Sequence, residues 1–439
     1  MKRLPLLFHH VMYNLRGGFL VRPLAIALAL GCAGALFSWM EEEFPAASAW
    51  VPRAIFPSHS DPQSAQVILA AIGGSIMTVV SIVFAILLMT LTLASMQFSP
   101  RIILGFARDG VTQWTLGIFL GTFSYCMAAL PAAHSQPRPF APVATVFGAM
   151  LLALTCVAWL LFFIHHISQA ISVNQIVDKI ASETEVVIDD VMPWPRNPNL
   201  RRFDERVEDF KWELTVPNEI SGYVRFIDVN RLVALAKGFH IKVHVLRRVG
   251  HFVPRGVPLL AISRADRATP DRIADILATF DFGPSRTLQQ DVEFGILQIV
   301  DIALKAISPA VNDPSTAISC VDQLSRLIIR VASREPPEMG FYDPPGNLRV
   351  YIPWMGFERL LDSAFEQIRM YSKGDLAVSL RMLRGLGDIA RTTHDDEIHR
   401  VVLDRASRVV AGCAERLDEQ EMSEIRSRFL GLQTLLAAK

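Results

Sequence analysis

The side chains with the greatest capacity for chemistry gather in one segment of the second half of the chain. Arg286 precedes the helical pattern expected at 289–307 and Asp291 lies in its first turn, whereas Asn312 and Asp313 precede the next pattern, which starts at Pro314. A guanidinium, two carboxylates and an amide could together hold a polar ligand or contact another subunit. The structural alternative is that Asp313 occupies an N-cap position and Pro314 the first helical position. We favour the structural interpretation of this polar cluster.

Patterns typical of enzymes are absent from the sequence. There is no dinucleotide-binding glycine fingerprint, phosphate-binding loop, HExxH zinc motif or GxSxG nucleophile elbow. His394 and His399 are five residues apart and would not share a helical face as metal ligands do. The five cysteines form no CxxC pair, and the 43 basic residues are balanced by 43 acidic ones. We therefore predict no enzyme activity and no metal, cofactor or nucleic-acid site.

The elements that must position these residues begin with four apolar segments. The 439 residues are 51% hydrophobic and only 20% charged, which suits a chain that is partly embedded in a membrane. Uncharged apolar runs longer than about 18 residues indicate membrane-spanning helices. After a basic interfacial segment at residues 1–22, we predict a four-helix transmembrane domain at residues 23–171. Its spans are expected at 23–40, 66–99, 112–133 and 143–171.

Basic residues indicate how these spans are oriented. Lysine and arginine concentrate before the first span and between the second and third, whereas the other two loops carry one arginine each. Loops rich in lysine and arginine stay on the cytoplasmic side. We therefore predict a multi-pass protein of the inner (cytoplasmic) membrane with both termini in the cytoplasm.

A stripe of small and hydroxylated residues, with Leu88 as the large exception, follows one face of the second span. Small residues let membrane helices pack closely, whereas the same surface could line a narrow wetted path with Leu88 as its constriction. The packing seam is the simpler interpretation because it requires no pore. The stripe consists of Ala71, Gly74, Thr78, Ser81, Ala85, Leu88, Thr92, Ser95 and Ser99.

The pattern changes after the fourth span to that of a soluble region. Residues 172–213 predict a connecting helix and a proline-rich linker. Residues 214–265 are rich in β-forming residues and glycine, and predict a small barrel-like or sandwich-like β module. A turn within it looks like one found in lipoyl-type domains but lacks the context of a carrier lysine. Residues 266–439 predict a helical bundle. The fold class is thus an α-helical membrane protein with a cytoplasmic α+β region.

Two motifs carry a resemblance that covers nearly the whole chain. One is FGPSRTLQQD at 282–291 together with AISPAVNDPSTA at 306–317, and the other is TLASMQFSPR at 92–101. Both resemble an uncharacterised bacterial family of predicted membrane proteins catalogued as domain of unknown function 2254. The resemblance implies a bacterial membrane location and the layout given above. It implies no activity, substrate or catalytic residue.

Two hypotheses for function follow from these patterns. The first is a homo-oligomeric, channel-like permeation protein in which the second span surrounds or lines a central axis and the cytoplasmic modules assemble or gate it. A small ion or other small ligand would then pass along the stripe. The alternative is a membrane-anchored sensor or scaffold whose cytoplasmic domain binds a ligand or a protein partner. In both cases the lipid bilayer is a partner.

Overall fold

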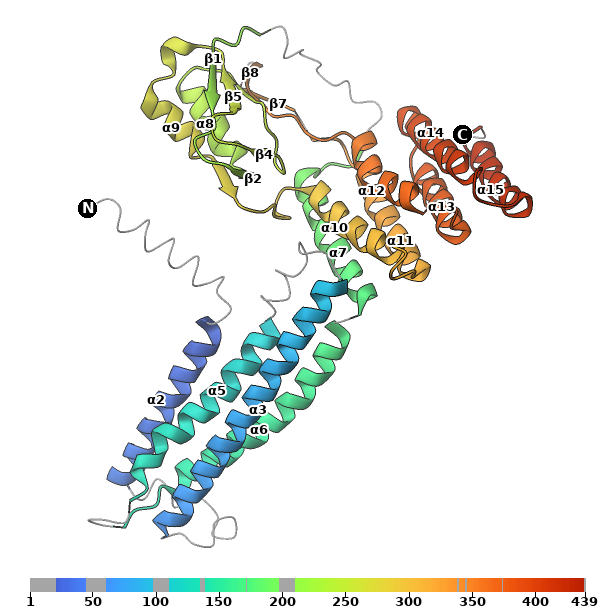
Figure 1. Cartoon of the computed structure of the whole chain (residues 1–439). Helices are drawn as coiled ribbons and strands as arrows, with labels where there is room; N and C mark the ends of the chain where they lie inside the picture. The colour runs from blue at the N-terminus through green and yellow to red at the C-terminus, as the bar shows by residue number, and fades with distance from the viewer. Residues whose placement is uncertain are drawn as a thin grey trace. The chain divides into compact units, whose positions relative to one another are not determined.

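The chain forms two compact units. The computed structural model describes residues 21–44, 61–97, 110–134, 139–170, 172–196, 210–337, 339–343, 346–372 and 374–437. The membrane unit extends to Ser172, and the C-terminal unit begins at Val173. Figure 1 labels most of the helices and strands of the two units.

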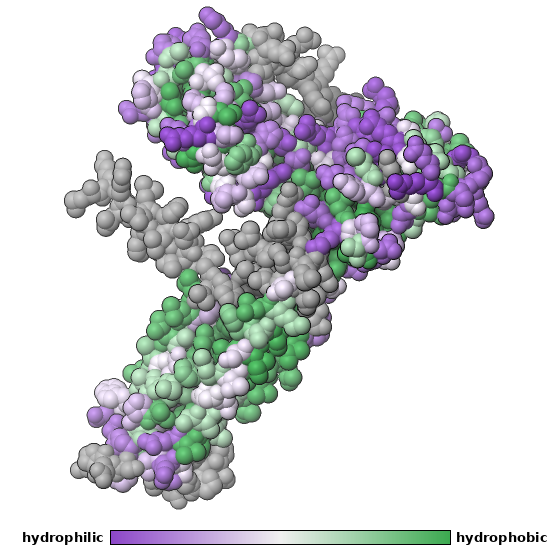
Figure 2. All heavy atoms as spheres, in the orientation of Figure 1, coloured by the Kyte–Doolittle hydropathy of each residue, from purple (hydrophilic) through white to green (hydrophobic). Residues whose placement is uncertain are grey.

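Four long helices make up the described part of the membrane unit. They are α2 (Val21–Glu43), α3 (Pro62–Gln97), α5 (Gly110–Ala129, continued by the 3-10 turn η2, Leu130–Ala132) and α6 (Val143–Ala170). Each is long and apolar enough to cross a membrane, so the chain has four candidate membrane-spanning helices, the number that the sequence predicts. Apolar residues cover most of their visible surface in Figure 2.

Helices α2 and α5 approach each other closely through glycines. A Cβ atom on Gly34 would lie only 2.5 Å from the carbonyl oxygen of Tyr125. Cβ atoms on Gly117 and Gly121 would come within 2.6 and 2.5 Å of side chains on α2. Backbones that approach this closely gain van der Waals contact, which is a main source of helix association in lipid. A tight helix seam in the described part of the membrane unit therefore runs between α2 and α5.

A buried carboxylate joins the end of α2 to the start of α6. Glu41 is 3% exposed, and it accepts hydrogen bonds from the backbone N–H groups of Ala144 (2.8 Å) and Thr145 (3.0 Å). The Thr145 hydroxyl donates a third, at 2.9 Å. A carboxylate at this position satisfies unpaired donors and complements the positive end of the helix dipole. The neighbouring Glu42 lies 3.4 Å from His134 Nε2.

Two mainly antiparallel sheets form one part of the C-terminal unit. The five-stranded sheet has the order β1-β5-β3-β8-β7, and the three-stranded sheet has the order β4-β2-β6. Helices α8 (Val229–Gly238) and α9 (Pro270–Leu277) and the 3-10 turn η4 (Ala265–Arg267) connect strands. The strands are β1 (Leu214–Pro217), β2 (Gly222–Ile227), β3 (Val243–Val245), β4 (Phe252–Val253), β5 (Pro258–Ile262), β6 (Phe280–Gly283), β7 (Gly340–Asp343) and β8 (Asn347–Tyr351).

The sheets extend beyond the residues expected to form them. Strands β6, β7 and β8 come from the region that the sequence analysis assigned to the helical bundle. Strand β8 pairs in parallel with β3, with Val350 opposite Val243 and Tyr351 opposite His244. Val243 and Val350 are fully buried in the core that the two sheets share with α8 and α9. The apolar residues of β8 thus complete a core that begins about a hundred residues earlier in the chain.

Helices form the rest of the C-terminal unit, as the sequence predicts. They are α7 (Val173–Val191), α10 (Val292–Ala306), α11 (Pro314–Ala332), α12 (Phe357–Tyr371), α13 (Leu376–Thr392), α14 (Asp396–Cys413) and α15 (Glu419–Ala437). Each of the first six buries apolar residues at helical spacing, and α10, α11, α13 and α14 begin with an aspartate N-cap.

Helix α7 belongs to the core of the C-terminal unit, although the sequence analysis described it as a connecting helix. Its buried residues include Val177, Ile180 and Ile188, and it packs against α10 and α11. Helices α7 and α10 approach each other closely at Gly295, which has no side chain. A Cβ atom on this residue would lie 2.1 Å from the hydroxyl oxygen of Thr184.

Ion pairs reinforce the contact between α7 and α11. Arg326 pairs with Glu185 at 2.5 Å and with Asp178 at 2.9 Å. Asp189 pairs with Arg330 at 2.5 Å and also with the next arginine, Arg334, at 2.7 Å. These charges are partly solvated, so each pair adds modestly to the apolar packing beneath it.

Candidate functional site

The stripe on α3 lies on the outer surface of the single-chain membrane unit. All of its members whose side chains the structure describes are exposed, and Leu88 is 51% exposed. The side chains of Ser95 and Ser99 lie outside the described part. The exposed members are Ala71, Gly74, Thr78, Ser81, Ala85, Leu88 and Thr92. The stripe therefore does not form a seam within the described part of this chain.

The opposite face of α3 packs inside the membrane unit. Ile76, Val80 and Val83 are buried against α5 and α6, in clusters that include Phe119 and Phe163. Helix α3 thus buries some of its large apolar side chains and exposes others, including Met77, Ile82 and Met89, beside the small and hydroxylated residues of the stripe. The small residues of the stripe would allow close approach of another helix, whereas the exposed large apolar residues beside them suit contact with lipid.

The hydroxyl groups of the stripe are oriented by their own helix. Thr78 donates to the carbonyl of Gly74 at 3.1 Å, and Thr92 donates to that of Leu88 at 2.8 Å. Ser81 makes the same bond to the carbonyl four residues before it, at 3.1 Å. With their protons engaged, these oxygens present lone pairs outward, which can accept hydrogen bonds from water or contact a cation.

The structure brings together two of the four residues of the predicted polar cluster. Arg286 donates two hydrogen bonds of 2.7 Å, one to each carboxylate oxygen of Asp291. Asp291 is 3% exposed, and it also accepts from the backbone N–H of Phe294 as the N-cap of α10. This bidentate geometry is the strong form of an arginine–carboxylate pair.

Two residues that the sequence analysis did not place in the cluster complete it. Glu293 accepts from Arg286 at 2.9 Å, from Arg248 at 3.5 Å and from the Ser363 hydroxyl at 3.2 Å. Arg248 comes from the segment between β3 and β4, and Ser363 comes from α12. Two arginines and two carboxylates thus balance in charge and join the sheets to the helices. We call Arg248, Arg286, Asp291 and Glu293 the ion-pair joint.

Gly250 allows the β3–β4 segment to lie against the joint. Its φ of +87° belongs to the left-handed region, which a side chain disfavours. A Cβ atom there would lie 2.5 Å from Asp291 Oδ2 and 2.9 Å from Arg286 Nη2. Backbone conformation and space therefore both require glycine at this position.

The other two predicted cluster residues lie in the turn before α11. Asp313 is its N-cap and accepts from the Thr316 backbone at 3.1 Å, with Pro314 in the first turn. Asn312 is exposed and has a φ of +50°, a conformation that asparagine tolerates better than most residues. In this turn, therefore, the geometry supports the structural alternative.

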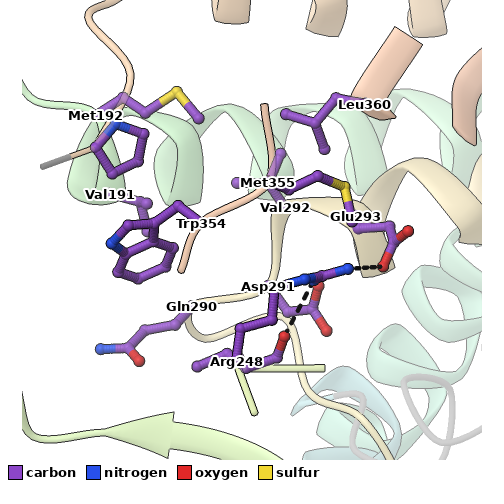
Figure 3. Close-up of a pocket in the computed structure, with 12 residues that line it drawn as sticks. Val191, Met192, Arg248, Gln290, Asp291, Val292, Glu293, Trp354, Met355 and Leu360 are labelled. Carbon is purple, nitrogen blue, oxygen red and sulfur yellow. Dashed lines mark hydrogen bonds and ion pairs between the residues drawn. The ribbon is translucent and has the colours of Figure 1, made fainter. Parts of the chain in front are cut away.

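A small pocket lies beside the joint. It is lined by apolar residues that include Met192, Trp354 and Leu360, and by the charged groups of Arg248 and Glu293 (Figure 3). Its volume of about 30 Å³ would hold about two water molecules. Small-molecule sites are typically about ten times larger or more. The geometry of the joint is that of a structural connection rather than a ligand site.

The joint predicts a pH-dependent stability. Burial alone would raise the pKa of Glu293. The net effect is a lowered pKa, because two kinds of interaction favour the charged carboxylate more strongly: the positive charges of Arg286 and Arg248, and hydrogen bonds from Arg286 and Ser363. A lowered pKa stabilises the fold above the ordinary value of 4.5, and this contribution is lost as the pH falls through the folded-state pKa. We expect wild type to unfold at a higher temperature than Glu293→Gln at neutral pH.

The difference between these two proteins should shrink as the pH falls below 4.5. Thermal unfolding of the intact detergent-solubilised protein across this range measures it. A difference that stays constant with pH would contradict the assignment of the stabilisation to the Glu293 charge.

Sequence reasoning missed the glycine seam and Glu41 in the membrane unit. The seam had a visible signal, because Gly117 and Gly121 form the GxxxG pattern typical of close helix packing. The role of Glu41 had no comparable signal, since its acceptor geometry depends on the fold of a segment a hundred residues away. Among the described residues, no group of three histidine, cysteine or acidic side chains is arranged to hold a metal ion.

With four candidate membrane-spanning helices followed by a C-terminal unit of helices and sheets, the chain has the architecture of a polytopic membrane protein. It belongs to the family described as predicted membrane protein (DUF2254), whose model matches residues 16–388. It is similar to uncharacterised proteins of Mycobacterium bovis and Mycobacterium tuberculosis. Each is 31% identical over 416 residues, which cover 92% of this chain and 78% of the relative. No solved structure is significantly similar to the chain.

Proposed function

We propose that this protein is a homo-oligomeric permeation protein of the bacterial inner membrane. Copies would meet along the stripe, so that α3 of each subunit surrounds a shared axis. The C-terminal unit would lie in the cytoplasm with both chain ends and would assemble or gate the path. The observation that carries the proposal is the exposure of all seven described members of the stripe, six of which are small or hydroxylated.

The other helices provide a comparison for this surface. Helices α2 and α6 expose large apolar residues, including Leu28 at 62% and Leu154 at 67%, which is the surface expected to face lipid. The α3 stripe differs because it offers small side chains and outward lone pairs. Both properties suit close approach of a second α3, or a narrow path for water and small cations.

Leu88 has a particular place in this proposal. It is the one large apolar residue of the stripe, so a ring of Leu88 side chains around an axis would form an apolar constriction. Such constrictions close a path by excluding water. Replacing Leu88 with serine should therefore raise conductance.

The experiment has two measurements on purified full-length protein. The first is the oligomeric state in detergent and the position of α3 by electron microscopy, where a ring of three or more subunits with α3 innermost is expected. The second is cation conductance in reconstituted bilayers for wild type, Leu88→Ser and the matched control Leu154→Ser on α6. We expect increased conductance for Leu88→Ser only.

Each result can reject a different part of the proposal. A monomer, or a dimer with the stripe dry against another helix, would remove the shared axis. In that case the scaffold alternative would account for the exposed stripe as an anchoring contact. Equal conductance of the two serine variants would reject Leu88 as the constriction.

A further inference from the structure

Two exposed apolar side chains belong to the β2–β4 part of the three-stranded sheet: Phe252 lies on the edge strand, and Ile220 lies two residues before β2. Ile220 is 56% exposed and Phe252, on the edge strand β4, is 52% exposed. The ring of Phe252 lies 5.1 Å from that of Tyr223 on the paired strand. The buried Asn218 side chain holds the two chain segments together by donating to the carbonyls of Ile220 and, at 3.1 Å, of Val253. The pair is therefore presented on a fixed backbone.

Arginines flank this pair. Arg255 is exposed, and its backbone N–H donates to the Ser221 hydroxyl at 2.9 Å, beside Ile220. Arg247 is exposed on the segment that leads to Phe252. Across the described ranges of the chain, neither arginine makes an ion pair. We call Ile220, Phe252, Arg247 and Arg255 the basic apolar tip.

Nearby titratable groups leave the tip with a positive balance. Burial, with the charges of Arg248 and Arg247, lowers the pKa of His251, so this imidazole is neutral near pH 7. Arg225 on β2 pairs with Asp281 at 2.8 Å, which cancels both charges. Glu219 is exposed beside Ile220 and opposes one of the two free arginine charges of the tip.

We infer that the basic apolar tip inserts its apolar side chains into the surface of the anionic membrane in which the chain is anchored. An aromatic and an aliphatic side chain that are flanked by arginines form the composition of interfacial membrane contacts. Arginine guanidinium groups complement lipid phosphates, and anionic lipid attracts basic segments close to its surface. The inference does not depend on the permeation proposal.

The connectivity of the chain favours lipid over other occupants. Only residues 171 and 172 separate the last residue of α6 from the first residue of α7, which is a core helix of the C-terminal unit. The C-terminal unit is therefore tethered to the bilayer by a very short link. A short tether gives the tip a high effective concentration of lipid surface, so a weak contact would still be occupied.

Spin labels on full-length protein test the inference. Cys32, the one described cysteine that is exposed, is first replaced with alanine, and single cysteines are then introduced as Phe252→Cys or as the control Val311→Cys. Val311 is also 52% exposed but lies between α10 and α11, away from the tip. Each labelled protein is reconstituted in vesicles of phosphatidylcholine, with and without phosphatidylglycerol. Collision with oxygen reports immersion in lipid, and collision with a water-soluble nickel chelate reports exposure to water.

With phosphatidylglycerol, we expect oxygen collisions to exceed nickel collisions at position 252, and the reverse at position 311. Removing the anionic lipid, or combining Arg247→Glu with Arg255→Glu, should return position 252 to the aqueous pattern. Both arginines are exposed, so unchanged unfolding temperatures would show that the double variant keeps its fold. An aqueous label at 252 in anionic vesicles would overturn the inference. So would a label shielded from both reagents whatever the lipid, since that result indicates a protein partner or a second copy.

Discussion

Replacing Arg286 with methionine is expected to destabilise the C-terminal unit by about 3–5 kcal/mol, because it leaves a buried carboxylate without its partner. Asp291 is 3% exposed and loses two hydrogen bonds of 2.7 Å in this variant. Methionine keeps most of the aliphatic volume of the arginine stem. The expected loss therefore comes from the unpaired charge rather than from a cavity.

Hydrogen exchange of the α10 amides in the intact protein measures this effect locally. Adding Asp291→Asn to Arg286→Met should restore much of the protection, because asparagine removes the charge and still caps α10. The matched control is Arg225→Met, whose partner Asp281 is half-exposed, so the expected loss is below about 1 kcal/mol. Similar losses in the two arginine variants, or no rescue by asparagine, would contradict the role given to Asp291.

Replacing Gly34 with alanine is expected to separate α2 from α5 and to lower the unfolding temperature of the membrane unit. The added Cβ would lie 2.5 Å from the carbonyl oxygen of Tyr125 and 3.0 Å from its Cα. Backbone atoms cannot rotate away as a side chain can, so the helices themselves must move. Overpacking typically costs about 1–3 kcal/mol, and a clash with backbone belongs at the upper end of that range.

Gly121→Ala provides the graded comparison on the same seam. Its Cβ would meet the Leu30 Cδ1 atom at 2.5 Å, and a leucine side chain can change rotamer. Thermal unfolding in detergent should therefore rank wild type above Gly121→Ala and Gly121→Ala above Gly34→Ala. If Gly34→Ala unfolded at the wild-type temperature, the close approach of α2 and α5 would be wrong.

The parts of the fold that depend on local pattern could be predicted from sequence. Uncharged apolar runs of sufficient length specify the four spans, and helical spacing with an aspartate cap and a proline specifies the start of α11 at Pro314. The parallel pairing of β8 with β3 could not be predicted, because no local pattern links strands that are a hundred residues apart.

For the candidate sites too, contacts between residues close in the chain could be predicted from sequence, whereas contacts between distant residues could not. Arg286 and Asp291 are five residues apart, and their pairing was within reach of sequence reasoning. Arg248 joins them from another part of the β module, and only the close approach allowed by Gly250 brings it there. On α3, the spacing of three and four residues predicts that the stripe shares one face, and its described members are all exposed. Which face points outward depends on how α5 and α6 pack, and the sequence of α3 alone does not determine it.

The place of α7 in the fold has a mechanical consequence. A helix that only connected two parts of a chain would absorb movement by bending or by unwinding. Helix α7 cannot do so freely, because its apolar side is embedded between α10 and α11 and its acidic residues are held by Arg326, Arg330 and Arg334. A force applied at the first residue of α7 would therefore act directly on the core that this helix forms with α10 and α11, without a flexible segment inside the C-terminal unit to absorb it.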